Sequence, residues 1–334
     1  MNIIGHQARS RMRRTVVVLV ASALLSACGG IHRALPPITV DAVPSLSINT
    51  PLLVSGCALT HCWAAGSTTV QGITSTLIER RLDTGGWTTV TAPSTDGDLT
   101  VMACSSTTCV IGGSRNGLDL LWSASMASAT LSSQTVSTGS GIDALSCVAD
   151  GCMAIDHTTD GAYRLVNVSD LTVAPVSTLE AHSTVTSLSC TSSTQCWLGA
   201  TTAAGQAVVL TTSDGVSWTA VATPTWSSVL SLWCDQHCVA LTQDASAQYV
   251  ARQTSSGWTT THVPFTASAL SCVSSQHCVV VGQDDSAAGA GAVWSPDQLQ
   301  RLVIRYAPTP LNRVGCSTSD CVAVGSTTLL SLRR

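Results

Sequence analysis

The sequence predicts an all-β protein, a seven-bladed β-propeller of four-stranded blades, and three observations predict it. A short unit recurs seven times at intervals of 38 to 47 residues, which is the period of a propeller blade. Four β-type runs fit into one interval. The composition, 45% hydrophobic and only 10% charged, with abundant Thr, Ser, Val and Ala, favours strands, and the alternating runs exclude helical repeats of similar period.

The repeated unit contains two cysteines in the pattern apolar-Ser-Cys, a short polar turn, then Cys-Val-apolar-apolar-Gly, as in residues 270–282. Two β-type runs flank the turn, which indicates a hairpin whose cysteines face each other across the first and second strands. We therefore expect one disulfide in each repeat. The expected pairs are Cys57 with Cys62, Cys104 with Cys109, Cys147 with Cys152, Cys190 with Cys196, Cys234 with Cys238, Cys272 with Cys278, and Cys316 with Cys321.

A zinc site is the alternative, because His61, His237 and His277 precede a cysteine at a spacing that resembles zinc ligands. The other four repeats have no histidine at this position, and seven pairs cannot be divided among four-cysteine sites. Export to an oxidising compartment also favours disulfides, each of which adds on the order of 2 kcal/mol by closing a small loop. We expect no metal site and interpret the histidines as turn residues.

Each cysteine hairpin is followed by a third and a fourth β-type run. The third runs are residues 76–81, 118–123, 162–166, 207–211, 247–251 and 292–295. The fourth is often opened by Trp and closed by Pro, as in residues 87–93, 218–224 and 258–264. The last repeat stops after its third strand, residues 327–332, whereas residues 38–44 match the fourth-strand pattern. We expect residues 38–43 to pair antiparallel with 327–332 and close a propeller of residues 38–334, because open edges favour aggregation.

The N-terminus has the pattern of an export signal. Residues 1–14 contain four arginines and no acid, and residues 15–25 form an apolar run too short to span a bilayer. Leu25-Ser26-Ala27-Cys28 then resembles the lipobox of bacterial lipoproteins. The resemblance implies a signal peptide over 1–27, a lipid such as palmitate on Cys28, and a tether over 28–37 that holds the protein at the outer face of the cytoplasmic membrane.

A second motif lies between the third and fourth runs of one repeat. Residues 212–218 read Thr-Ser-Asp-Gly-Val-Ser-Trp and resemble the Asp-box of bacterial neuraminidase-type repeats, through Thr212, Asp214, Gly215 and Trp218. The resemblance implies that the Asp ties down the turn and that the Trp packs against the sheet. With the cysteine hairpins, the chain is similar to exported Asp-box propellers, a group that includes sialidases and propeller-type photosystem assembly factors.

Charge and motif content argue against several functions. Loss of the leader with its four arginines takes the net charge from −4 to −8, which disfavours nucleic acid as a partner. The sequence has no phosphate loop, no Gly-x-Ser-x-Gly elbow and no His-Glu-x-x-His. A sialidase also needs an arginine triad and a tyrosine beside a glutamate, but the family's Arg-Ile-Pro motif is absent and only Glu79 and Glu180 are available. We assign no catalytic residue and no cofactor.

In a propeller, the second-to-third and fourth-to-first connections share one face, where ligands usually bind near the axis. The polar residues expected there are Asp96, Asp98, Arg115, Asp143, Asp156, His157, Asp160, His182, Trp226, Asp244, Asp284, Asp285, Asn312 and Arg313. The candidates for a ligand site are Arg115, Asp156, His157, Asp284, Asp285 and Arg313, although a solvated acidic rim is the simpler interpretation of any one of them. The longest loop, residues 283–291, could bind a cation or a partner, and an ordinary mobile loop is again simpler.

The sequence therefore favours a non-enzymatic, monomeric cell-surface lipoprotein whose propeller binds or scaffolds a protein or glycan partner, with the lipid anchor as its contact with the membrane. The alternative is a sialidase-like or other carbohydrate-active hydrolase. A convergent Arg, Tyr and Glu cluster on the axial face would favour the enzyme, whereas scattered charges would favour binding.

Overall fold

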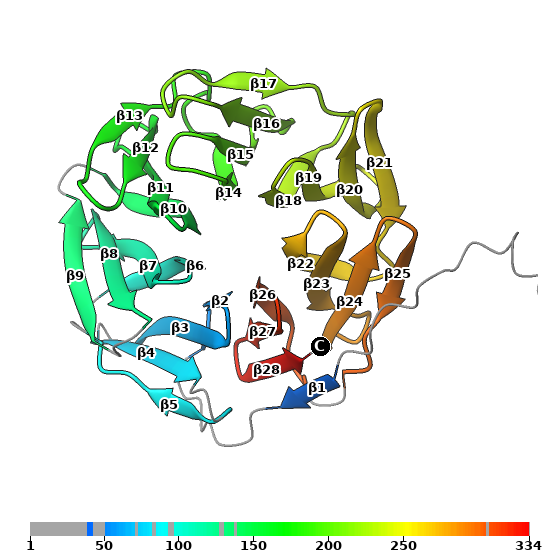
Figure 1. Cartoon of the computed structure of the whole chain (residues 1–334), viewed down its shortest axis with the longest axis horizontal. Coiled ribbons are helices and arrows are strands. Elements are labelled where there is room, and N and C mark those ends of the chain that lie inside the picture. Colours follow the sequence, from blue (N-terminus) through cyan, green and yellow to red (C-terminus); the bar gives the residue numbers. More distant parts are fainter. Residues whose placement is uncertain are drawn as a thin grey trace, which may run out of the picture. The chain divides into compact units, whose positions relative to one another are not determined.

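The computed structural model confirms the seven-bladed β-propeller (Figure 1). It describes residues 39–42, 51–70, 73–81, 85–92, 97–126, 130–136, 139–304 and 307–333. The expected signal peptide, the tether with Cys28, and Asp96 lie outside these residues. In the part of the chain that the structure describes, the regular structure is seven antiparallel sheets of four strands, and no helix there could cross a membrane.

Each blade takes four consecutive strands, and the last blade takes three together with β1. Blades 1 to 3 contain β2 (Val54–Ala58), β3 (His61–Val70), β4 (Ile73–Arg81), β5 (Trp87–Thr89); β6 (Asp98–Cys104), β7 (Thr108–Arg115), β8 (Leu118–Ser125), β9 (Leu131–Val136); and β10 (Gly141–Val148), β11 (Gly151–His157), β12 (Tyr163–Asn167), β13 (Val173–Pro175). Blades 4 and 5 contain β14 (Thr184–Cys190), β15 (Cys196–Thr201), β16 (Ala207–Thr212), β17 (Thr219–Val221); and β18 (Ser228–Cys234), β19 (Cys238–Gln243), β20 (Gln248–Thr254), β21 (Gly257–His262). Blades 6 and 7 contain β22 (Thr266–Ser274), β23 (His277–Gln283), β24 (Gly289–Ser295), β25 (Gln298–Arg301); and β26 (Leu311–Cys316), β27 (Asp320–Gly325), β28 (Thr328–Arg333), β1 (Thr39–Ala42).

The position of a strand in its blade explains its composition. The second strands, such as β23 and β27, are buried almost from end to end because each sheet has a neighbouring blade on both faces. They are therefore continuous apolar runs. The fourth strands lie at the rim, so β21 alternates between half-buried and exposed residues and is rich in threonine.

The hydrophobic core consists of seven clusters, one between each pair of neighbouring blades. Trp63 and Trp122, both fully buried, fill the contact between blades 1 and 2. Phe265, the single phenylalanine, lies in the contact between blades 5 and 6. Each blade is thus stabilised by its two neighbours, and the ring needs every blade to complete its core.

All seven expected disulfides are present, one in each blade. The two cysteines of each pair lie directly opposite each other on the first and second strands, with Cα atoms 4.0 to 4.1 Å apart. This spacing is shorter than that of a hydrogen-bonded pair in an antiparallel ladder.

In four of the seven blades the repeated motif ends in a glycine, which allows a close approach of the two backbones. In six of the seven sheets the pairing of first and second strands shifts by one residue at a β-bulge. A Cβ on Gly113 would lie 1.9 Å from the carbonyl oxygen of Asp98, and one on Gly282 would lie 2.0 Å from that of Thr266. The motif therefore ends in glycine where the first strand crosses closest to the second.

The ring is closed by the two ends of the chain, as the sequence predicts. The strand β1 pairs antiparallel with β28, with Val40 opposite Leu332 and Ala42 opposite Leu330. Figure 1 shows β1, in blue, completing the sheet of β26 to β28, in red. Val40 packs against the core cluster between blades 6 and 7, so the segment contributes apolar contacts in addition to the ladder.

Blades 7 and 1 then meet through a tight interface. A Cβ on Gly315 would lie 2.7 Å from the Cα of Gly56, so the two first strands approach through their backbones. The guanidinium of Arg81 lies 3.0 Å from the carboxylate of Asp320, and both side chains are about nine-tenths buried. This ion pair joins the first blade of the sequence to the last.

Candidate functional site

An axial channel has a volume of about 510 Å³, and the first strands of all seven blades line it. The first cysteine of every disulfide belongs to this lining. Because first strands end and second strands begin on one face of the ring, the seven disulfides surround one mouth of the channel. The opposite mouth is formed by the beginnings of the first strands.

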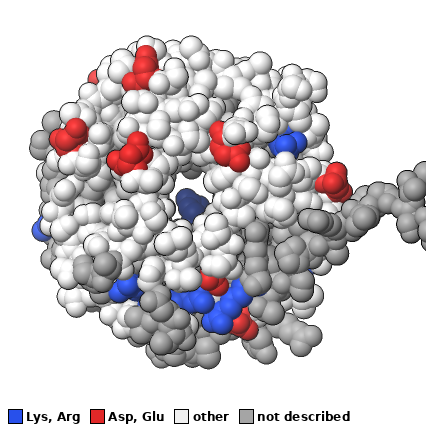
Figure 2. Space-filling view, in the orientation of Figure 1, with Lys and Arg blue, Asp and Glu red and all other residues white. Residues whose placement is uncertain are grey.

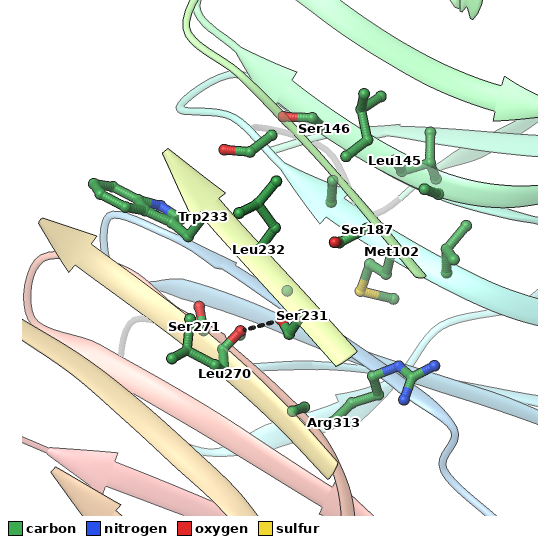
Figure 3. A pocket seen from close by; sticks show the side chains of 18 of the residues that line it. Met102, Leu145, Ser146, Ser187, Ser231, Leu232, Trp233, Leu270, Ser271 and Arg313 are labelled. Carbon is green, nitrogen blue, oxygen red and sulfur yellow. Dashed lines mark hydrogen bonds between the residues drawn. The ribbon is translucent and has the colours of Figure 1, made fainter. Parts of the chain in front are cut away.

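Serine hydroxyls of the repeated motif hold the wall of the channel together. The hydroxyl of Ser146 accepts a 2.9 Å hydrogen bond from the backbone N–H of Cys190 in the next blade. Ser189 and Ser271 accept the equivalent bonds, of 2.8 and 3.0 Å, from the next cysteine along the ring. Ser231 instead donates to the carbonyl oxygen of Leu270 at 3.0 Å, as Figure 3 shows. The serines that precede the cysteines therefore lock neighbouring blades to each other.

Two charged residues, Arg313 and Asp235, belong to the channel lining. Arg313 is the third residue of β26 and extends into the space between the first strands (Figure 3). Figure 2 shows basic atoms deep in the central opening, with uncharged atoms around it. Asp235 follows Cys234 at the disulfide mouth, where it accepts hydrogen bonds from the backbone N–H groups of His237 at 2.8 Å and Ser275 at 3.4 Å.

Within the described part of the chain, Arg313 has one hydrogen bond. One of its terminal nitrogens donates to the carbonyl oxygen of Asn312 at 3.0 Å, and among the described residues no carboxylate forms an ion pair with it. The side chain is exposed to the channel. The surrounding strands nevertheless displace much of its water, and this desolvation lowers the pKa of Arg313. A guanidinium remains charged at physiological pH even so.

A second group of ionisable residues lies between blades 2 and 3, away from the channel lining. Asp156 on β11 is fully buried and binds Arg164 on β12 through both carboxylate oxygens, one of them 3.0 Å from Nε. Beside it, Nδ1 of His157 lies 2.8 Å from a carboxylate oxygen of Asp143, and this pair is about one-third exposed. Burial raises the pKa of Asp143, and the His157 partner opposes that shift.

Asp119 on β8 completes this group. Its side chain is fully buried, and the backbone of Gly139 packs against it. Desolvation, followed by the nearby carboxylate of Asp156, raises the pKa of Asp119 to about 7. Asp119 therefore takes up a proton near neutral pH, whereas Asp156 is paired with Arg164.

The remaining sequence candidates lie apart from one another. Arg115 is half-buried at the end of β7. Asp284 accepts hydrogen bonds from the backbone N–H groups of Ser286 and Ala288, at 2.9 and 3.1 Å, so its carboxylate organises its own turn and its pKa is lowered. Asp285 beside it is exposed. Asp156 and His157 are adjacent on β11 but have different partners, Arg164 and Asp143, and Arg313 lies apart from all of them in the channel.

The residues of the turn between β16 and β17 make a compact set of contacts. One carboxylate oxygen of Asp214 accepts hydrogen bonds from the N–H groups of Val216 and Ser217, at 2.8 and 2.7 Å, and one of 3.0 Å from the hydroxyl of Thr212. These bonds lower the pKa of Asp214. Trp218 is buried in the contact between blades 3 and 4.

The residues that a sialidase-like site would need do not converge in the described part of the chain. Tyr163 donates to the carbonyl oxygen of Ser183, and Glu79 is buried in β4, where it accepts a 2.7 Å hydrogen bond from Thr89. Arg313 lies in the channel. The described residues also contain no group of three or more His, Cys, Asp or Glu that could hold a metal ion.

Sequence reasoning missed Asp119 and Arg164, and one signal pointed to their place. Asp156 occupies the position where Gly66, Gly113, Gly282 and Gly325 end the motif in four other blades. The other two blades have Ala200 and Thr242 at this position. Asp156 is therefore the one charged residue at this position in the seven repeats, which marks a site whose surroundings differ from those of the other blades.

No protein-family profile matches the sequence, and no curated protein matches it either. Solved structures match through the fold. The virginiamycin B lyase of Staphylococcus aureus aligns over 89% of this chain and 99% of its own, with a TM-score of 0.64 and 10% identity. YCF48 bound to D1 peptide aligns over 90% of this chain and 97% of its own, with a TM-score of 0.60 and 14% identity. The WD40 repeats of RRP9 align over 88% of this chain and 97% of their own, with a TM-score of 0.63 and 14% identity. At these identities the likeness establishes the propeller fold.

Proposed function

We propose that this chain is an exported, lipid-anchored binding protein whose propeller holds a segment of a polypeptide partner in its axial channel. The observation that carries the proposal is the channel itself, a cavity of about 510 Å³ walled by all seven blades. Its volume lies within the range of roughly 300 to 1,000 Å³ that ligand pockets span. It therefore suits a short extended segment rather than a folded domain.

The wall of the channel favours a polypeptide over a glycan. A sugar needs many hydrogen-bonding partners, but the hydroxyls of Ser146, Ser189 and Ser271 are already engaged between blades. Apolar side chains such as Met102 and Leu232 share the lining and can contact peptide side chains. The fold comparison supports this choice, since YCF48, a propeller of similar architecture, has been solved with a peptide bound.

The lipid anchor is the second part of the proposal and rests on the sequence Leu25-Ser26-Ala27-Cys28. The extended tether reaches at most about 35 Å, so the partner would be bound close to the membrane surface. Cys28→Ala should leave the leader attached and abolish fatty-acid labelling. Labelling that persists unchanged would contradict the anchor without affecting the channel.

A carbohydrate-active hydrolase is the less supported function. Asp119 and Asp156 are two neighbouring carboxyl groups, as a glycosidase requires, but both are fully buried and no substrate could reach them. The lyases of similar fold share only about one residue in ten with this chain, which gives no basis for transferring their activity.

Site-specific photo-cross-linking in intact cells tests the proposal. A photoreactive residue at Ser268, which lines the channel, is compared with one at Thr260, exposed on the outer strand β21. We expect one discrete polypeptide adduct from position 268 and none of the same mass from position 260. Equal adducts from both positions, or adducts from 260 alone, would contradict binding in the channel.

A further inference from the structure

Arg313 is an unneutralised cation inside the channel. A guanidinium has five N–H donors, and one of its nitrogens donates to the carbonyl oxygen of Asn312. No other described residue forms a hydrogen bond or an ion pair with it. The remaining donors therefore face the channel, where a ligand could meet them.

The other charged residue of the lining does not neutralise Arg313. Asp235 follows the first strand of blade 5, whereas Arg313 lies near the beginning of the first strand of blade 7. The residue of blade 5 at the equivalent place is Ser231, four residues before Asp235, which is about 13 Å along a strand. The carboxylate of Asp235 also has hydrogen bonds of its own at the disulfide mouth.

The fold does not require an arginine at this position. The strand pairing resumes after the bulge of each first strand at one equivalent residue. In the other five bulged blades that residue is Val101, Ala144, Ser187, Ser231 or Ala269. All five are small or of medium size and uncharged. Arg313 is therefore the one departure in this set, and it places a charge in the channel where the equivalent residues of the other blades have none.

We propose that Arg313 binds a carboxylate group of the polypeptide that occupies the channel. A carboxylate is the anionic group that every unmodified polypeptide can supply, from an acidic side chain or from its C-terminus. Two parallel N–H to oxygen hydrogen bonds match the planar guanidinium to a carboxylate, and such charge-assisted bonds are stronger than hydrogen bonds between neutral groups. This inference rests on the proposed function, because it names the group by which the partner is recognised.

The test is an NMR titration of the exported, processed protein labelled with ¹⁵N at arginine. Four probes are added separately: acetyl-pentaalanine with a free C-terminus, acetyl-Ala-Ala-Glu-Ala-Ala amide, acetyl-pentaalanine amide, and inorganic phosphate. The Nε–H signal of Arg313 is identified by its absence in Arg313→Lys. We expect a saturable shift of this signal with one or both carboxylate peptides, and the peptide that acts identifies the source of the carboxylate.

Two variants sharpen the result. Arg313→Lys keeps the charge but loses the planar fork, and we expect it to weaken binding of the active peptide by about tenfold or more, measured by calorimetry. Arg115→Gln, a half-buried arginine outside the channel lining, should bind that peptide as the parent does. Equal binding of the neutral amide, a response to phosphate alone, or no response to either carboxylate would each overturn the proposal. A channel adduct from position 268 would leave the proposed function standing in all three cases.

Discussion

The hydroxyl of Ser189 accepts a 2.8 Å hydrogen bond from the backbone N–H of Cys234 and donates one of 3.3 Å to the carbonyl oxygen of the same residue. The two residues belong to neighbouring blades, and all the groups involved are buried. The serine therefore replaces the backbone partner that an innermost strand lacks on its inner side. Ser146 and Ser271 accept the equivalent bond, and this contact explains the serine that precedes the first cysteine in three of the seven repeats.

Removal of that hydroxyl should destabilise the propeller. Ser189→Ala leaves the N–H and the carbonyl of Cys234 buried without their partner, which costs about 1–3 kcal/mol. Ser213→Ala, at an exposed position, should change the free energy of unfolding by less than about 0.5 kcal/mol. Urea unfolding measures both, and equal effects of the two variants would show that the serine does not join the blades.

The disulfides should be mapped entirely within repeats. Non-reducing peptide mapping of the exported protein is expected to find seven bridges, each between cysteines four to six residues apart. Replacing Cys147 and Cys152 together by alanine should lower the free energy of unfolding by on the order of 2 kcal/mol, because the loop that their disulfide closes is short. Free thiols or bridges between blades would refute the pairing.

The buried carboxyl group of Asp119 should make stability depend on pH. Its pKa in the folded protein, about 7, lies above the value near 3.9 of an unfolded chain. The folded state therefore binds the proton more tightly, and stability is greatest below pH 4 for this group, falls as the pH rises to about 7, and is constant above that. The total loss is on the order of 2–4 kcal/mol.

Asp119→Asn tests this assignment, because the amide has no proton to lose. We expect the variant to be more stable than the parent at pH 8. Its free energy of unfolding should also fall much less than that of the parent between pH 4 and pH 7. Thermal unfolding at a series of pH values measures the difference. A variant whose pH profile matches that of the parent would mean that Asp119 does not carry the proton. The profile must be read with Asp143, Asp156, His157 and Arg164 in place, since these groups face the same interface.

The ring closure should be essential to the whole domain. Deletion of residues 38–44 removes the strand in which Val40 lies opposite Leu332, and it exposes the apolar edge of β28. We expect a large fall in melting temperature and a tendency to aggregate, measured by calorimetry and light scattering. A truncated protein that melts with the parent would contradict a closed seven-bladed ring.

The sequence was sufficient for the parts of the fold that depend on local pattern. The cysteine hairpins are local, and the pairing of Val40 with Leu332 follows from counting strands in the last repeat. The contacts between blades could not be predicted, because they join residues about 45 positions apart, such as Ser189 and Cys234. Asp119 and Asp156 meet only because of the rotation between blades 2 and 3, which one repeat does not encode.

The expected ligand face was only partly informative for the same reason. Asp156 was expected at a surface connection, yet it is fully buried and forms an ion pair with Arg164. Arg313 was one of many polar residues on that face, and its isolation in the channel became visible only when all seven first strands were in place. The sequence shows which residues are charged. Whether an oppositely charged side chain lies beside each of them depends on the three-dimensional structure.

The central claim is that a polypeptide occupies the axial channel, and blocking the channel tests it most directly. Leu230 lines the channel at the bulge of β18 and is half-buried, with part of its side chain against the core cluster between blades 5 and 6. Leu230→Trp keeps a large apolar side chain at this position, so it should fill part of the channel and preserve the fold. The measurement is the yield of polypeptide adduct from a photoreactive residue at Ser268 in intact cells, with Thr260→Trp on the outer strand as the matched control. We predict that Leu230→Trp lowers this yield at least tenfold at an unchanged melting temperature. Thr260→Trp should leave the yield unchanged. An undiminished yield of adduct in Leu230→Trp would contradict binding of a polypeptide in the channel.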